Sequence, residues 1–152
     1  MRQLFILILS IGIIQSAIAQ VNKSAQAKAT LNHTAIYVVD LEKSGRFYQD
    51  IIGLDAIPEP FHDGKHIWMK TSETSTLHII KGADKPKEYF KNQHTCFSVS
   101  DFNGFIEKIS KANIQYENVS GKINSITTRI DGVHQIWLRD PDGYWLEIND
   151  MR

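Results

Sequence analysis

The sequence predicts an α+β fold in which one structural unit, βαβββ, occurs twice. Three observations lead to this prediction. HTAIYVVDL (33–41) aligns with HTCFSVSDF (94–102), so that His, Thr, Val and Asp coincide at a shift of 61 residues (94 minus 33). The segment after each Asp has helical periodicity, and the later segments alternate apolar and polar residues as strands do. Two such units packed edge to edge would form one curved sheet with the helices on its outer side.

Each repeat begins with a strand that ends at an aspartate suited to cap a helix. The helices are expected over 41–52, closed by Gly53, and over 102–112, closed by Asn113. Three short strands should follow each helix: 54–57, 66–71 and 76–81 in the first repeat, and 114–119, 133–139 and 144–149 in the second. The polar connection 120–132 behaves as an insertion. It is either a lid over a ligand or a plain surface loop.

The last predicted hairpin, DGVHQIWLRDPDGYWLEIND (131–150), contains an acid, Glu147, whose direction matters. The run 140–143 has turn composition. After it, the apolar Tyr144, Leu146 and Ile148 alternate with Trp145, Glu147 and Asn149. Because strand side chains alternate between faces, Glu147 points away from the aliphatic residues. Taken alone, this pattern indicates an acid exposed to solvent.

The repeat changes the interpretation of Glu147. His33 and His94 occupy equivalent places on the first strands, and His78 and Glu147 do so on the last strands. All four side chains are expected on the face that the helices do not cover. A single histidine of this kind is more often hydrogen-bonded or merely exposed. Three neutral imidazoles and one carboxylate together suit one divalent transition ion, such as Zn²⁺, Ni²⁺, Fe²⁺ or Mn²⁺.

Four further residues are candidates for a substrate pocket. Trp68 and Trp137 could form its walls, although packing is the plainer explanation for an aromatic residue. Cys96 lies two residues beyond His94 on the same face and either lines the cavity or acts as a small buried hydrophobe. Gln135 shares the face of Trp137.

Length and composition set the domain organisation. Arg2, the apolar run 4–14 and the Ala17-Ile18-Ala19 motif predict a secretory signal peptide over 1–19, so the protein should be periplasmic or secreted. A membrane anchor is the alternative, but the apolar run is shorter than the ~20 residues that span a bilayer. Residues 20–30 should be a flexible leader. Residues 31–152 should form one domain with modules at about 31–82 and 91–150, enough for a hydrophobic core.

Charge and cysteine content narrow the partners. Cys96 is the lone cysteine, which excludes an intrachain disulfide. The formal net charge is zero and no basic stripe appears, so neither nucleic acid nor an anionic membrane surface is an expected partner of the mature protein. A small-molecule substrate is expected instead.

Four segments resemble the vicinal oxygen chelate superfamily, also called the glyoxalase/fosfomycin-resistance/dioxygenase group: HTAIYVVDLEKSGRFYQDIIGL (33–54), LHII (77–80), HTCFSVSD (94–101) and GVHQIWLRDPDGYWLEI (132–148). The resemblance covers residues 31–150. It implies an eight-stranded, partly closed mixed sheet with the helices outside, built around one metal ion. It also implies that His33, His78, His94 and Glu147 are the ligands. Members of the superfamily often pair modules between two chains, so the resemblance makes a homodimer the expected partner arrangement.

The resemblance leads to three hypotheses about function. The first is a metal-dependent glyoxalase-like lyase or isomerase that acts on a small oxygen-chelating metabolite through an enediolate-type intermediate, with Glu147 as ligand and general base. His78 stands where glyoxalase I proteins carry a carboxylate, which argues against a lactoylglutathione lyase. The second is an Fe(II)-dependent dioxygenase of a phenolic compound, because His33, His94 and Glu147 match a two-histidine, one-carboxylate triad. The third is a non-catalytic protein that sequesters a ligand.

Overall fold

The structure is a computed structural model that describes residues 28–151. A compact unit begins at Leu31. The predicted signal peptide (1–19) and most of the predicted leader (20–30) lie outside the described residues. Within 28–151, no helix has both the length and the apolar character needed to cross a membrane.

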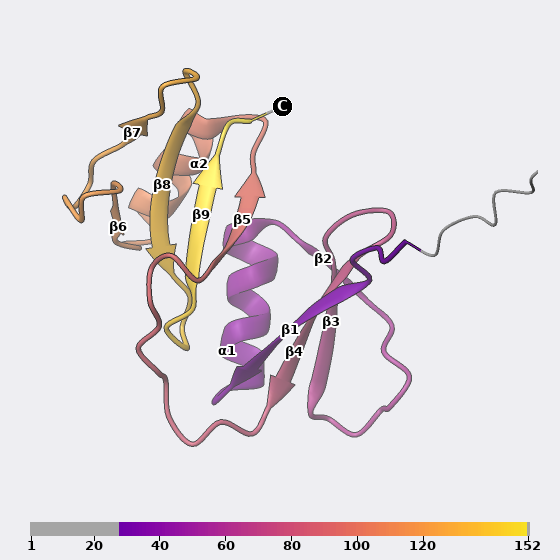
Figure 1. The fold of residues 1–152 in the computed structure, drawn as a ribbon. Helices are drawn as coiled ribbons and strands as arrows, with labels where there is room; N and C mark the ends of the chain where they lie inside the picture. The colour runs from indigo at the N-terminus through magenta and orange to yellow at the C-terminus, as the bar shows by residue number, and fades with distance from the viewer. Residues whose placement is uncertain (1–27, 152) are drawn as a thin grey trace, which may run out of the picture. The chain divides into compact units, whose positions relative to one another are not determined.

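The predicted repeat is present as two modules, each with its own mixed sheet (Figure 1). The first sheet has the order β1-β4-β3-β2 and the second the order β5-β9-β8-β6, with β7 paired to β8. The first module contains β1 (His33–Val38), α1 (Leu41–Arg46), the π-helix η1 (Phe47–Ile52), β2 (Asp55–Ile57), β3 (His66–Lys70) and β4 (Thr76–Lys81). The second contains β5 (His94–Ser98), α2 (Phe102–Lys111), β6 (Tyr116–Glu117), β7 (Thr127–Thr128), β8 (His134–Arg139) and β9 (Trp145–Asn149).

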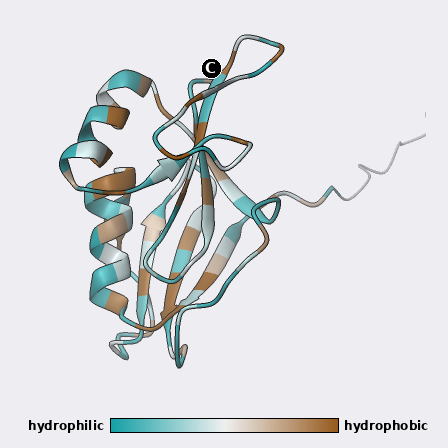
Figure 2. Cartoon of the chain, turned by 90° about the vertical axis from the view of Figure 1, so that its left-hand side faces the viewer, coloured by the Kyte–Doolittle hydropathy of each residue, from teal (hydrophilic) through white to brown (hydrophobic). Residues whose placement is uncertain are grey.

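The predicted fold class is therefore confirmed: mixed sheets, not closed into a barrel, carry helices on one side (Figure 2). In both modules the first strand runs parallel to the last, and the other neighbours are antiparallel. The structure has one strand more than the eight expected: β7 lies in the polar connection 120–132, where no strand is predicted. Only two residues long, it is below the length at which alternation can be recognised.

The helices start and end where the capping residues predict. Asp40 accepts a hydrogen bond from the Lys43 N–H, and Asp101 does the same for Gly104. Gly53 ends the first helical segment with φ of 91°. The second half of that segment is a π-helix and not the predicted α-helix. Six residues are too few for a hydrophobic period to separate the two forms.

The core lies between the sheets and the helices, as the alternation of the strands predicts. Its strand residues all point to the helical side: Ile36, Val38, Leu77, Ile79, Ile136, Leu138, Leu146 and Ile148 are buried. The helices add Tyr48, Phe105 and Ile109 to this core. Burying these side chains is the main source of stability for a domain without disulfides. It also fixes which strand residues face the uncovered side.

The turn before β9 joins the two modules through two buried aspartates. Asp142 accepts hydrogen bonds from the Val39 N–H (2.7 Å) and the Ser44 hydroxyl (2.6 Å) of the first module. Asp140 accepts one from the Tyr48 hydroxyl (2.8 Å) with one carboxylate oxygen. Its other oxygen accepts the N–H groups of Asp142 and Tyr144, which shapes the turn itself. The turn therefore sets the register of β9 and also fastens the second module to the first.

Asp140 makes the stability of the domain depend on pH. Burial raises the pKa of its carboxyl group from 3.8 to about 6, although the hydrogen bond from Tyr48 acts in the opposite direction. Because the folded protein then holds this proton more tightly than the unfolded chain, the associated stability is fully present below pH 3.8. It is lost as the pH rises through about 6.

We expect Asp140→Asn to remove this loss, since an amide keeps an oxygen acceptor and does not ionise. Urea unfolding between pH 4 and 7.5 measures this difference. As the pH rises, the free energy of unfolding of the wild type should fall by up to ~3 kcal/mol more than that of the variant, at 1.36 kcal/mol per pKa unit. Asp84→Asn, at an exposed position, is the matched control and should parallel the wild type. Parallel curves for Asp140→Asn as well would show that burial does not raise this pKa.

Candidate functional site

The strand register of the second module places four polar or aromatic residues in one row across its uncovered face. Cys96 lies opposite Glu147, Glu147 opposite Trp137, and Trp137 opposite Glu117. The same arrangement recurs in the first module, where Trp68 lies opposite His78. Trp68 and Trp137 are thus related by the same shift of 69 residues (137 minus 68) as His78 and Glu147 (147 minus 78).

Glu147 and His94, two of the predicted ligands, lie together as one pair. The Nε2 atom of His94 lies 3.3 Å from the Oε2 atom of Glu147, and the Glu147 residue is 8% exposed. The Nδ1 atom of His94 lies 3.0 Å from the carbonyl oxygen of Lys91. Since a carbonyl only accepts, Nδ1 donates to it, and Nε2 is the ring nitrogen that faces Glu147. A backbone carbonyl bound to the other ring nitrogen is the usual support of a metal-binding histidine.

The second oxygen of Glu147 is held by its neighbours. Its Oε1 atom accepts hydrogen bonds from the Asn149 amide (3.0 Å) and the Cys96 thiol (3.4 Å). Asn149 is itself fixed by the Ser98 hydroxyl, which donates to the amide oxygen over 2.9 Å. Burial and the Glu147 charge raise the pKa of the Cys96 thiol to about 12, so that the thiol remains a donor. The carboxylate therefore keeps Oε2 directed toward His94.

His33 and His78 form the second pair, in the first module. Their rings stack face to face with centroids 4.2 Å apart, and Trp68 stacks on the other side of His78 at 4.1 Å. Burial, and next the nearby His33, lower the pKa of His78, which favours the neutral ring that a metal ligand requires. The His33 Nδ1 atom lies 2.8 Å from the side-chain oxygen of Asn32. The pair opens into a cavity of about 690 Å³ whose lining includes Phe61 and Trp68.

The structure brings the four predicted ligands together as two pairs and not as one group of four. Within the described residues, no group of three or more His, Cys, Asp or Glu side chains is placed to hold a metal ion. The two pairs lie on different sheets, His33 and His78 on β1 and β4, and His94 and Glu147 on β5 and β9 (Figure 1). Each pair is half of the predicted site.

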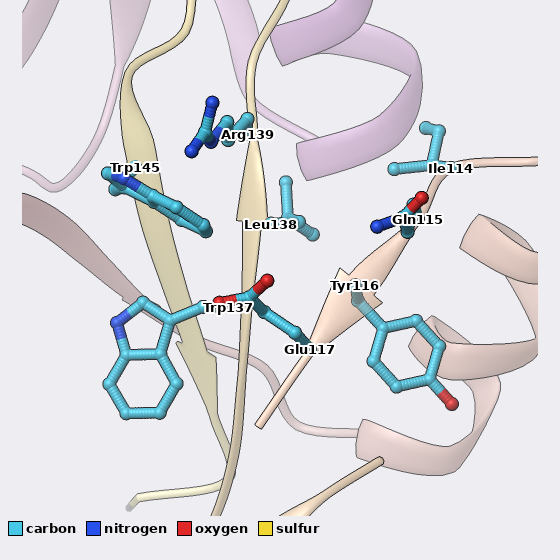
Figure 3. A pocket seen from close by; sticks show the side chains of 8 residues that line it. All are labelled: Ile114, Gln115, Tyr116, Glu117, Trp137, Leu138, Arg139 and Trp145. Carbon is cyan, nitrogen blue, oxygen red and sulfur yellow. The ribbon is translucent and has the colours of Figure 1, made fainter. Parts of the chain in front are cut away.

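A second cavity, of about 370 Å³, is lined by residues of β6, β8 and β9 in the second module (Figure 3). Its walls include Trp137 and Trp145, and Arg139 and Glu117 are its charged residues. Lys91 reaches over the Trp137 ring from the segment between the modules. Its ammonium group donates to Glu117 over 2.7 Å and lies 4.9 Å from the Trp137 ring.

The predicted pocket residues have different positions. Trp68 lines the first cavity and Trp137 the second, while Cys96 touches Glu147 directly. The indole N–H groups of Trp68 and Trp137 are buried with no hydrogen-bond partner in the described part of the chain. Gln135 is buried opposite Asn149 and lines neither cavity.

Two residues of this site, Asn149 and Arg139, are not among the sequence-based candidates. The alternation of side chains along each strand could have identified both as candidates, because Asn149 lies on the same face of β9 as Glu147, and Arg139 on the same face of β8 as Trp137. Their partners, Cys96 for Asn149 and the Trp145 ring for Arg139, lie on neighbouring strands, and the alternation within one strand does not identify them.

A duplicated βαβββ unit with histidine and carboxylate pairs on the uncovered sheet faces defines a glyoxalase-type fold with candidate metal ligands. The comparisons agree with this class. The chain belongs to the Glyoxalase/Bleomycin resistance protein/Dioxygenase superfamily, whose family model matches residues 30–148.

Relatives in this superfamily differ in the reactions that their names describe. The chain is 32% identical over 118 residues to human mitochondrial methylmalonyl-CoA epimerase, covering 70% of this chain and 66% of the epimerase. It is 24% identical over 159 residues to lactoylglutathione lyase of Pseudomonas putida, covering 82% and 86% of the two chains. The solved structure of the oxidase ChaP-H2 matches with a TM-score of 0.69 and 27% identity, covering 83% and 96%. The chain thus spans just under two thirds of the length of the epimerase.

Proposed function

We propose that this protein is a metal-dependent lyase or isomerase that removes a proton from the carbon next to a carbonyl group of a small, oxygen-chelating metabolite. One observation carries the proposal. Glu147 is a buried carboxylate that hydrogen bonds hold by one oxygen, while its other oxygen faces His94. A base with a fixed orientation, shielded from solvent, is what proton abstraction from carbon needs. The similarity to an epimerase and a lyase supports the same type of chemistry.

The donor set fits a divalent transition ion. His33, His78, His94 and Glu147 would hold it, and three neutral imidazoles with one carboxylate are suitable ligands. The hydrogen bond from His94 Nδ1 to the Lys91 carbonyl leaves Nε2 available. When bound, the ion would supply a Lewis acid that stabilises negative charge on the substrate oxygens.

The residues of this chain divide the other tasks. Glu147 takes the proton through Oε2 and returns it to the product. Asn149 and Cys96 keep that oxygen in place by binding Oε1. Trp137, which is 5% exposed and lies opposite Glu147, limits access of water to the carboxylate. Reduced access protects a carbanion-like species from side reactions.

We further propose that two copies of the chain complete each site. The separation of the two ligand pairs within one chain supports this. In a two-fold dimer, the His33 and His78 face of one copy would meet the His94 and Glu147 face of the other, and two equivalent sites would form. The stacked rings of His33 and His78 lie in nearly parallel planes, 6° apart. An imidazole lone pair lies in the plane of its ring, so at least one ring must turn for both to bind one ion.

A second candidate function is an Fe(II)-dependent oxygenase of a phenolic compound. The 27% identity to the oxidase ChaP-H2, together with the triad of His33, His94 and Glu147, favours it. The two candidates are distinguished by the metal they need and by what they consume. Only the oxygenase would take up O₂ with catechols when loaded with iron. Solvent deuterium would enter an unchanged substrate only in the lyase or isomerase.

Metal content tests the site. Purified residues 20–152 should contain about one divalent ion per chain by elemental analysis, whereas His94→Ala and Glu147→Gln should lower metal affinity at least tenfold. His134→Ala, at a surface histidine paired with Asp150, is the matched control and should keep the metal.

Glu147→Gln should also slow deuterium exchange into methylmalonyl-CoA or acetoin by about 10²-fold or more. A wild type without metal, or unchanged metal in both ligand variants, contradicts the proposal. Tight ligand binding that survives metal removal, with no exchange, would indicate a sequestering protein instead.

Complementation tests whether two chains share the site. His33→Ala/His78→Ala and His94→Ala/Glu147→Ala should each be inactive. After subunit exchange in a 1:1 mixture, half of the dimers are mixed and each has one intact site, so about a quarter of the wild-type metal content and activity should return. Each variant mixed with itself is the control. No recovery, despite mixed dimers shown by mass spectrometry, would place each site within one chain.

We also propose that the protein is exported and that residues 1–19 are removed. The charged start, the apolar run and the Ala17-Ile18-Ala19 motif support this. Mass spectrometry of the protein from periplasm or medium should find Gln20 as the first residue, and replacing Ala17 and Ala19 by Gln should block the cleavage. An intact Met1 on cytoplasmic protein alone would contradict export.

A further inference from the structure

We propose that Arg139, held against Trp145, forms a subsite for a carboxylate group of the substrate beside the proposed metal site. The inference rests on the proposed function, because the subsite selects among substrates of that same site. The substrates selected in this way are small oxygen-chelating acids whose carboxylate is separate from the oxygens that bind the metal.

The strand register places Arg139 within reach of the same ligand as Glu147. Arg139 pairs with Trp145, and the next pair on this face is Trp137 with Glu147. Two residues along a strand and one strand across correspond to roughly 8 Å between the α-carbons of Arg139 and Glu147. A molecule of a few carbon atoms can therefore contact both. Figure 3 shows Arg139 and Trp145 next to each other in the pocket.

The guanidinium group is held in position before any ligand arrives. It lies 4.4 Å from the centre of the Trp145 ring, a cation–π contact. Trp145 is in turn fixed, because it is buried and its indole N–H donates to the Tyr89 carbonyl over 2.9 Å. A guanidinium stacked on an aromatic ring keeps its N–H donors free at the edge. Those donors match the two oxygens of a carboxylate.

The charge of Arg139 has no carboxylate partner within the part of the chain that the structure describes. The other described arginines do have one: Arg46 pairs with Glu42 and Arg129 with Asp131. Lys91, whose ammonium group lies over the Trp137 ring, is neutralised by Glu117. Among the described residues, Arg139 therefore gives this cavity one positive charge that no carboxylate neutralises, and the strand register places it near Glu147. A single positive charge suits a singly charged carboxylate better than a phosphate dianion.

A pair of chelating probes tests the subsite on the metal-loaded protein. Acetohydroxamate chelates a metal through two oxygens, and succinate monohydroxamate adds a carboxylate a few bonds away. By calorimetry, the wild type should bind the second probe about tenfold more tightly than the first. Arg139→Gln should lose this preference and still bind acetohydroxamate as the wild type does. Arg46→Gln, at an exposed arginine on α1, is the control and should keep the preference.

A second measurement separates failure of the subsite from failure of the metal site. Benzoate should quench the tryptophan fluorescence of the metal-free wild type saturably, and Arg139→Gln should weaken this binding about tenfold. If neither hydroxamate binds but benzoate binding depends on Arg139, the metal site is wrong and the subsite stands. If benzoate does not bind, if Arg139→Gln changes neither preference nor quenching, or if inorganic phosphate displaces benzoate better than acetate does, the carboxylate subsite is overturned.

Discussion

The arrangement of this molecule depends on two buried carboxylates in one four-residue turn. Asp140 and Asp142 hydrogen-bond to Tyr48, Ser44 and the Val39 backbone of the other module, more than ninety positions away in the sequence. Removing either acceptor would leave buried donors without partners, each at a cost of about 1–3 kcal/mol. The same turn also begins β9, the strand that carries Glu147. One local structure thus sets both the packing of the modules and the direction of the proposed base.

The duplication has produced two modules with the same register and different chemistry. His78 and Glu147 occupy equivalent places, as do Trp68 and Trp137, so the aromatic wall behind each ligand is common to both. Only the second module supplies a carboxylate. In the proposed site, one negative ligand would leave a divalent ion with a net positive charge, which favours an oxyanion on the substrate. Arg139, which has no carboxylate partner among residues 28–151, adds its positive charge to the same module.

The fold could be predicted from the sequence because its signals are local. Asp40, Asp101 and Gly53 mark helix ends through contacts within a few residues, and alternation assigns each strand residue to a face. The separation of the ligand pairs could not be predicted in this way. It depends on how one module docks on the other, through contacts such as Tyr48 to Asp140 that no periodicity encodes. For the same reason Asn149 and Arg139 are not among the residues predicted from the sequence, since their roles depend on partners from neighbouring strands.

The segment between the modules connects the aspartate turn to the site. At one end, the Lys87 N–H donates to the Asp142 carbonyl, and the Lys87 carbonyl lies so close to Gly143 that a side chain there would collide with it. At the other end, Tyr89 holds the Trp145 indole and the Lys91 carbonyl holds the His94 ring. The segment between the modules therefore fixes the tautomer of His94 and the position of Trp145, the ring on which Arg139 is stacked. Its position follows from the turn, so the docking of the modules also determines how the proposed site is oriented.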